Sequence, residues 1–214
     1  MQQFTHNWFR TALANLLIVA LLGCIMRYKI AFSLPFINQK NLLNAHSHFA
    51  FAGWITQAIM IFITGYISKH SPSFSFKKYN YLLLANLLTA YGMLFSFPFE
   101  GYATVSIIFS TLSLFASYAF AIAVWYDLNK ISEKAIAHYW IKAALVFNVL
   151  SSIGPYRLAY MMASKNVHQN VYLASIYFFL HFQYNGWFFF GCMGLFADKL
   201  KTQVISFNMQ KNIF

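Results

Sequence analysis

Three histidines lie within long apolar stretches of this sequence and are its strongest candidates for chemistry: His46, His48 and His181. Ionisable side chains are costly in a lipid environment, so those that occur there usually face a protein interior and mark a site. Neutral imidazole is also a frequent ligand of haem iron and of copper. The three side chains are therefore predicted cofactor ligands.

Helix geometry separates His46 from His48. Residues two apart point about 200° apart on a regular helix, so the pair does not ligate one centre. His46 shares its face with the small residue Gly53, which leaves room for a flat macrocycle. His46 is therefore the preferred ligand of the two, and His48 stays a candidate. On the face of His181, Tyr184 lies one turn away, where its hydroxyl could orient the imidazole.

The elements that position these residues follow from composition. Of the 214 residues, 60% are hydrophobic and 9% are charged, which is typical of a membrane protein. We predict an all-α integral membrane protein, a bundle of six transmembrane helices in one domain (residues 1–198), followed by a short polar cytoplasmic tail (residues 199–214). The predicted helices are long enough to cross a hydrocarbon core of about 30 Å and cover residues 8–26, 42–67, 81–97, 102–125, 137–162 and 171–197.

Basic residues indicate the orientation of the bundle. Most Lys and Arg residues flank the helices on one side, among them Lys77, Lys78 and Lys199. The positive-inside rule then places both termini in the cytoplasm, and we expect the inner membrane of a bacterium. Basic loops beside anionic lipid account for the net charge of +11. No basic stripe with interleaved aromatic residues lies outside the spans, so nucleic acid is not an expected partner.

Polar side chains within the spans also have a purely structural interpretation. Such groups often form hydrogen bonds between membrane helices, and the carboxamides within the spans are expected to do so: Asn15, Gln57, Asn86, Asn148, Gln183 and Asn185. Arg157 lies in the fifth span, where its side chain either reaches towards the interface or meets haem propionates. Pro155, in the same span, predicts a kink.

The order and orientation of these spans resemble the first six helices of the catalytic subunit of the heme-copper oxidase superfamily, which includes the nitric oxide reductases. The resemblance implies a low-spin haem ligand near the head of the second helix, at His46 or His48. It also implies that His181, on the sixth helix, binds the non-haem metal, copper or iron. Residues 181–187 (HFQYNGW) are similar to the reductase stretch His-Leu-Trp-Val-Glu-Gly-aromatic, with Asn185 in place of Glu.

The resemblance implies a haem-binding protein of respiratory electron transfer, and an oxidoreductase if the chain is an enzyme. The family normally uses about twelve helices and places further ligands on the later ones. A second copy or another membrane subunit is therefore expected to complete the ligand set. The alternative function is that of a non-catalytic multi-pass membrane protein, a small-molecule carrier or an assembly subunit. In that case the intramembrane histidines are interhelical hydrogen-bonding groups.

Overall fold

All regular secondary structure in the computed structural model, which describes residues 2–166 and 168–211, is helical. The predicted all-α class is therefore confirmed for this part of the chain. Two segments, η1 and η2, are π-helices, and the others are α-helices. In chain order the elements are α1 (Gln2–Ala31), α2 (Gln39–His48), η1 (Phe49–Thr56), α3 (Gln57–His70), α4 (Phe76–Glu100), α5 (Thr104–Asn129), α6 (Ile136–Ser151), α7 (Ile153–Ser164), α8 (Gln169–His181), η2 (Phe182–Phe188) and α9 (Phe189–Lys211).

Several of these helices are long and apolar enough to cross a membrane. The first five predicted spans coincide with the five that meet this description: Thr5–Ala31, Gln39–His70, Phe76–Glu100, Thr104–Asn129 and Ile136–Ser164. The sixth predicted span, residues 171–197, lies in the continuous helical stretch of α8, η2 and α9, which is not among the five. Together the apolar helices indicate a multi-pass membrane protein.

The C-terminal part of the chain extends the last helix. Residues 199–211, in the predicted polar tail, continue α9, and residues 212–214 lie outside the described residues. Earlier in the chain, the predicted kink is confirmed, because the fifth span breaks at Ser152 between α6 and α7. Pro155 lacks the backbone N–H that would bond to the carbonyl of Ser151, which explains the position of the break.

Local signals explain where the helices of the site begin and end. The Asn38 side chain accepts a hydrogen bond from the backbone N–H of Asn41 at 3.1 Å and so caps the start of α2. Gly101 ends α4 with a φ of 63°, which glycine adopts without steric cost. A Cβ atom at Gly101 would also lie 2.7 Å from the Asn41 side-chain oxygen. The connection after α4 therefore depends on this glycine.

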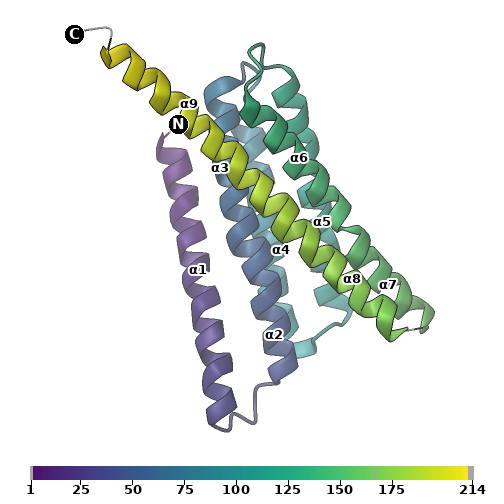
Figure 1. Cartoon of the computed structure of the whole chain (residues 1–214). Coiled ribbons are helices and arrows are strands. Elements are labelled where there is room, and N and C mark those ends of the chain that lie inside the picture. Colours follow the sequence, from purple (N-terminus) through teal and green to yellow (C-terminus); the bar gives the residue numbers. More distant parts are fainter. Residues whose placement is uncertain (1, 167, 212–214) are drawn as a thin grey trace. The chain divides into compact units, whose positions relative to one another are not determined.

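The chain divides into two compact units. Unit 1 comprises Met1–Ser68 and Phe74–Phe120. Within it, the helix formed by α2, η1 and α3 packs against α1 and against α4. Figure 1 shows α1 in purple beside this blue helix. Phe49, at the start of η1, lies between Leu22 of α1 and Ala90 and Leu94 of α4. The first two candidate histidines thus lie on the central helix of unit 1.

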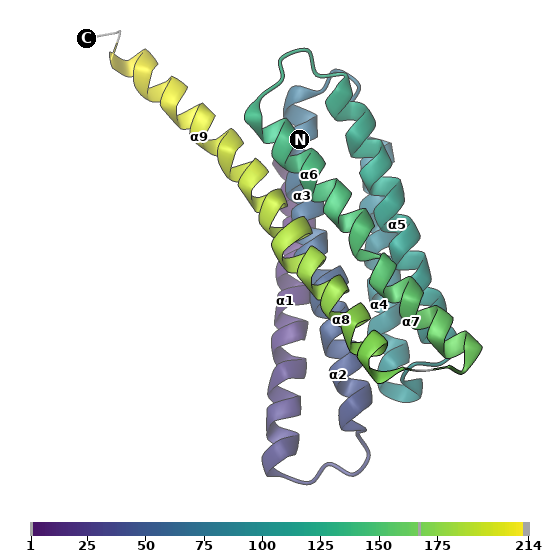
Figure 2. The same ribbon diagram turned by 45° about the vertical axis from the view of Figure 1, so that its right-hand side comes forward.

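Unit 2 comprises Lys69–Ser73 and Ala121–Phe214. Here α6 packs against η2 and α9, and α7 packs against α8. Figure 2 shows α6 and α7 in green against the yellow-green helix of α8 and α9. Trp187 in η2 is fully buried. The third candidate histidine, His181, lies at the junction of α8 and η2.

Candidate functional site

A π-helical segment begins directly after two of the candidate histidines. His48 ends α2 and η1 follows, while His181 ends α8 and η2 follows. A π-helix makes i to i+5 hydrogen bonds, is wider than an α-helix, and occurs mostly as short segments within α-helices, frequently at functional sites. The wider turn disturbs the regular carbonyl ladder, so nearby polar side chains gain access to backbone groups. Both histidines therefore lie at irregular positions of otherwise regular membrane-length helices.

His46 lies in the last turn of α2 and faces α1. A Cβ atom at Gly23 would be 3.5 Å from the His46 ring carbon Cε1, so the imidazole lies close along the α1 backbone. The Nδ1 atom of His46 is buried and has no hydrogen-bond partner among the described residues. Buried polar atoms normally have one. His46 is thus an imidazole with an unsatisfied nitrogen within an apolar helix pair.

His48, in contrast, is held by neighbouring residues. Its Nε2 atom is 2.7 Å from the Tyr102 hydroxyl, and its ring stacks on Phe97 with a centroid distance of 4.5 Å. The sequence favoured His46 over His48 as a ligand but kept both. The Nε2 atom of His48 is already engaged by Tyr102, and the preference for His46 stays a prediction.

Carboxamides from two flanking helices bind the backbone of η1. Asn15 of α1 donates to the Gly53 carbonyl at 2.6 Å, and Asn86 of α4 donates to the Ala52 carbonyl at 3.0 Å. Asn15 also accepts a hydrogen bond from the Tyr91 hydroxyl at 2.9 Å. These contacts confirm the predicted interhelical role of Asn15 and Asn86. Gly53 was expected to leave room by its small size, and the ring of Phe49 occupies the space beside it, since a Cβ atom there would lie 2.6 Å from that ring.

His181 lies on an exposed face of unit 2. Its Nδ1 atom is 3.2 Å from the Asn185 side-chain nitrogen, so the carboxamide donates within the same helix. Tyr184 is 50% exposed and packs edge-on against Phe188. On the buried side of η2, Gln183 donates to the side-chain oxygens of Asn148 and Ser151. The carboxamide of Gln183 therefore joins helices as predicted, whereas that of Asn185 bonds to its own helix.

The described residues contain no cluster of three or more His, Cys, Asp or Glu side chains that could hold a metal ion. His46 and His48 belong to unit 1 and His181 belongs to unit 2. Each candidate histidine therefore offers at most part of a ligand set.

No family model, curated protein or solved structure matches this chain. The resemblance to heme-copper oxidases therefore stays a prediction drawn from residues and spacing.

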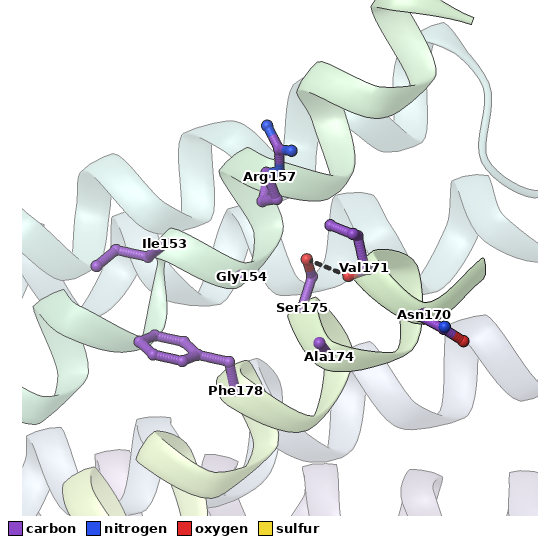
Figure 3. A pocket seen from close by; sticks show the side chains of 8 residues that line it. All are labelled: Ile153, Gly154, Arg157, Asn170, Val171, Ala174, Ser175 and Phe178. Carbon is purple, nitrogen blue, oxygen red and sulfur yellow. Dashed lines mark hydrogen bonds between the residues drawn. The ribbon is translucent and has the colours of Figure 1, made fainter. Parts of the chain in front are cut away.

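Arg157 borders a crevice between α7 and α8 (Figure 3). The crevice has a volume of about 350 Å³, and Ser175 and Phe178 of α8 line its opposite side. The Arg157 guanidinium carbon lies 5.3 Å from the centre of the Tyr160 ring, a cation–π contact within its own helix. The side chain is exposed, which agrees with an arginine that reaches towards the membrane interface.

Two contacts of the site were not expected from the sequence. Phe97 and Tyr102 were placed at the ends of predicted spans, with no link to His48. The helix break at Gly101 brings both rings to the imidazole. A glycine between two spans, one residue before a tyrosine, is the local signal that could have indicated this turn.

Proposed function

We propose that this chain is a membrane-embedded haem-binding protein of respiratory electron transfer, similar to the catalytic subunit of heme-copper oxidases. In this proposal six helices span the membrane, and both termini lie in the cytoplasm. His46 would bind the haem iron. His181 binds a second metal, copper or non-haem iron, and a second copy or another membrane subunit completes the ligand set.

The unsatisfied Nδ1 atom of His46 is the observation that carries the proposal. A polar atom that is buried without a partner costs free energy, and more so in a membrane. Iron ligation or a hydrogen bond to a ligand group would remove that cost. Gly23 leaves space beside the ring, since an alanine Cβ there would only just touch the imidazole at 3.5 Å. The observations therefore support His46 as an imidazole with one nitrogen that a ligand could engage.

In this proposal the two histidines of α2, His46 and His48, have different roles. A bound haem would supply an iron that gains and loses one electron. His46 holds the iron, and the apolar surroundings of α1 and α2 keep water away. His48 positions α2, because Tyr102 and Phe97 fix its ring. Arg157 is exposed on unit 2, and its contact with haem propionates stays a prediction.

An absorption spectrum of the protein purified from haem-replete cells tests the proposal. We expect a Soret band that is lost or shifted in His46→Ala and retained in His48→Ala, its matched control. Free imidazole added to His46→Gly should restore the band, because it replaces the missing ligand. A colourless protein, or a band that is unchanged in His46→Ala, would overturn the proposal.

The carboxamide contacts around η1 support a second candidate function. Asn15 and Asn86 join three helices through side-chain hydrogen bonds, as expected in a non-catalytic carrier or assembly subunit. In that case His46→Ala and His48→Ala leave the chromophore content unchanged and change only stability. Spectra and unfolding curves of the same two variants therefore distinguish the two functions.

A further inference from the structure

A groove lies between the last turns of α5 and the middle of α6, and both of its walls belong to unit 2. We call it the α5–α6 groove. Its volume is about 480 Å³, within the range of about 300–1,000 Å³ that is typical of small-molecule sites. The residues that line it include Ile122, Trp125, Tyr126 and Asn129 of α5 and Val146 and Val149 of α6.

The two ends of the α5–α6 groove differ in polarity. Asn129 is the last residue of α5, and Ile122 lies about 10 Å before it along the helix. On α6, Val149 lies about 10 Å beyond Lys142, whose ammonium group contacts Asn129. The groove is therefore polar near the connection between the two helices and apolar towards the interior of the membrane.

Two lysines and two aromatic rings form the polar end. The Lys142 Nζ atom lies 4.9 Å from the centre of the Trp125 ring and donates to the Asn129 side-chain oxygen at 2.6 Å. The Lys130 Nζ atom lies 4.2 Å from the centre of the Tyr126 ring. Trp and Tyr are enriched where membrane helices meet the lipid headgroups. The two cations are thus placed at headgroup level, beside rings that line the groove.

Among the described residues, no carboxylate forms an ion pair with Lys130 or Lys142. The Glu133 carboxylate is engaged by Lys201 at 2.8 Å. Lys142 is half-buried and lies about 9 Å from the start of α6 at Ile136. A cation within a membrane span is costly unless it reaches the interface or meets an anion. The polar end of the groove is therefore complementary to a negatively charged group.

We propose that the α5–α6 groove binds one anionic phospholipid. Its phosphate lies beside Lys142 and Lys130, and one acyl chain follows Ile122 and Val149 into the membrane. Basic pockets between membrane helices bind anionic headgroups in this way. The basic loops predict that this end is cytoplasmic, the side on which anionic lipids attract such residues. The proposal does not depend on haem, so it and the proposed function fail separately.

Native mass spectrometry of the detergent-solubilised protein tests the proposal. The protein is titrated with anionic phosphatidylglycerol and, in parallel, with zwitterionic phosphatidylcholine of the same acyl chains. We expect one phosphatidylglycerol to bind more tightly than phosphatidylcholine. Lys142→Gln should weaken phosphatidylglycerol binding about fivefold, the contribution of one lysine to the attraction of anionic lipid. Lys199→Gln is the matched control, because it removes the same charge from an exposed position of α9, and it should leave the binding unchanged.

A second variant tests the apolar end. Val149 is 42% exposed, and Val149→Trp fills the groove without a change of charge, so it should weaken the binding of both lipids. If Lys142→Gln does not fold, as judged by circular dichroism, Lys130→Gln replaces it with the same expected direction.

Equal affinity of the parent protein for the two lipids would overturn the proposal. Equal effects of Lys142→Gln and Lys199→Gln would do so as well, because a general loss of charge would then explain the result. Undiminished binding in Val149→Trp would place the lipid elsewhere. Displacement of the lipid by inorganic phosphate would show that the lysines recognise a free ion and not a phospholipid.

Discussion

The two histidine-led π-helices have closely similar sequences but different surroundings. In unit 1, side chains from α1 and α4 bind the backbone of η1, and His48 is fixed by Phe97 and Tyr102. In unit 2, η2 is held on one side by α6, while His181 is exposed and bonds to Asn185 of its own helix. One sequence pattern therefore occurs once in an enclosed site and once on a surface.

This difference identifies what determines the π-helix. The wide turn forms in η2 although His181, Tyr184 and Asn185 are exposed there. The two segments share a glycine–tryptophan pair and packing against one helix, α1 for η1 and α6 for η2, and we expect these features to favour the wide turn. The surroundings differ at the histidine, since Phe97 and Tyr102 contact the half-buried ring of His48, whereas His181 is exposed. Substitutions in α1 should thus change the stability around η1, and substitutions in α6 the stability around η2. The following substitutions test this, from the largest expected effect to the smallest.

Replacing Asn15 by alanine should have the largest effect. The substitution leaves the Gly53 carbonyl and the Tyr91 hydroxyl without their partner. We expect a loss of about 2–4 kcal/mol of unfolding free energy, because a buried unsatisfied group costs about 1–3 kcal/mol and the Tyr91 hydroxyl, which is only partly buried, costs less. Asn148→Ala, its counterpart, should cost less, because Gln183 keeps its hydrogen bond to Ser151 at 2.7 Å. Titration of detergent-solubilised protein with SDS, followed by circular dichroism, measures both. Equal losses would contradict the contrast between the two units.

The sequence predicted the interhelical role of Asn15 because a carboxamide in a membrane span has few other partners. It also predicted five of the spans and the break before Pro155, since apolar length and a missing N–H are local properties. The π-helices were not predicted, because face assignments assumed a regular period throughout. The exposure of His181 was not predicted either, since it depends on which helices pack together.

Alanine substitutions at Gly53 and Gly186 should show a further difference in stability between the two units. At Gly186 the new Cβ would lie 2.5 Å from the Cβ of Phe147, an atom next to the α6 backbone, so the helices must move apart. We expect a loss of about 1–3 kcal/mol, as for other overpacked sites. At Gly53 the obstacle is the ring of Phe49, which can rotate, so the loss should be smaller. Thermal unfolding of both variants measures the two losses of stability. A greater loss for Gly53→Ala than for Gly186→Ala would contradict this prediction.

Removal of the Tyr102 hydroxyl should have a more modest effect that is confined to unit 1. Tyr102→Phe keeps the ring contact with Phe97 but removes the hydrogen bond to His48, at a cost of about 0.5–1.5 kcal/mol. Asn185→Ala removes the corresponding bond to His181 on an exposed face, so its cost should be near zero. SDS titration of each single variant measures the difference. A larger loss for Asn185→Ala would show that its face is covered even in the purified chain.

The smallest effect concerns an exposed ion pair that joins the end of unit 2 to a loop. Lys201 of α9 donates to Glu133 at 2.8 Å, and this contact lowers the pKa of the Glu133 carboxyl below its ordinary value. A lowered pKa in the folded state stabilises the protein above the ordinary carboxyl pKa, and the contribution is lost as pH falls through the folded value. Lys201→Met should therefore be slightly less stable than the parent at neutral pH and equal to it in acid. A difference that persists in acid would assign the effect to packing of α9, and high salt should abolish it at neutral pH if charge is the cause.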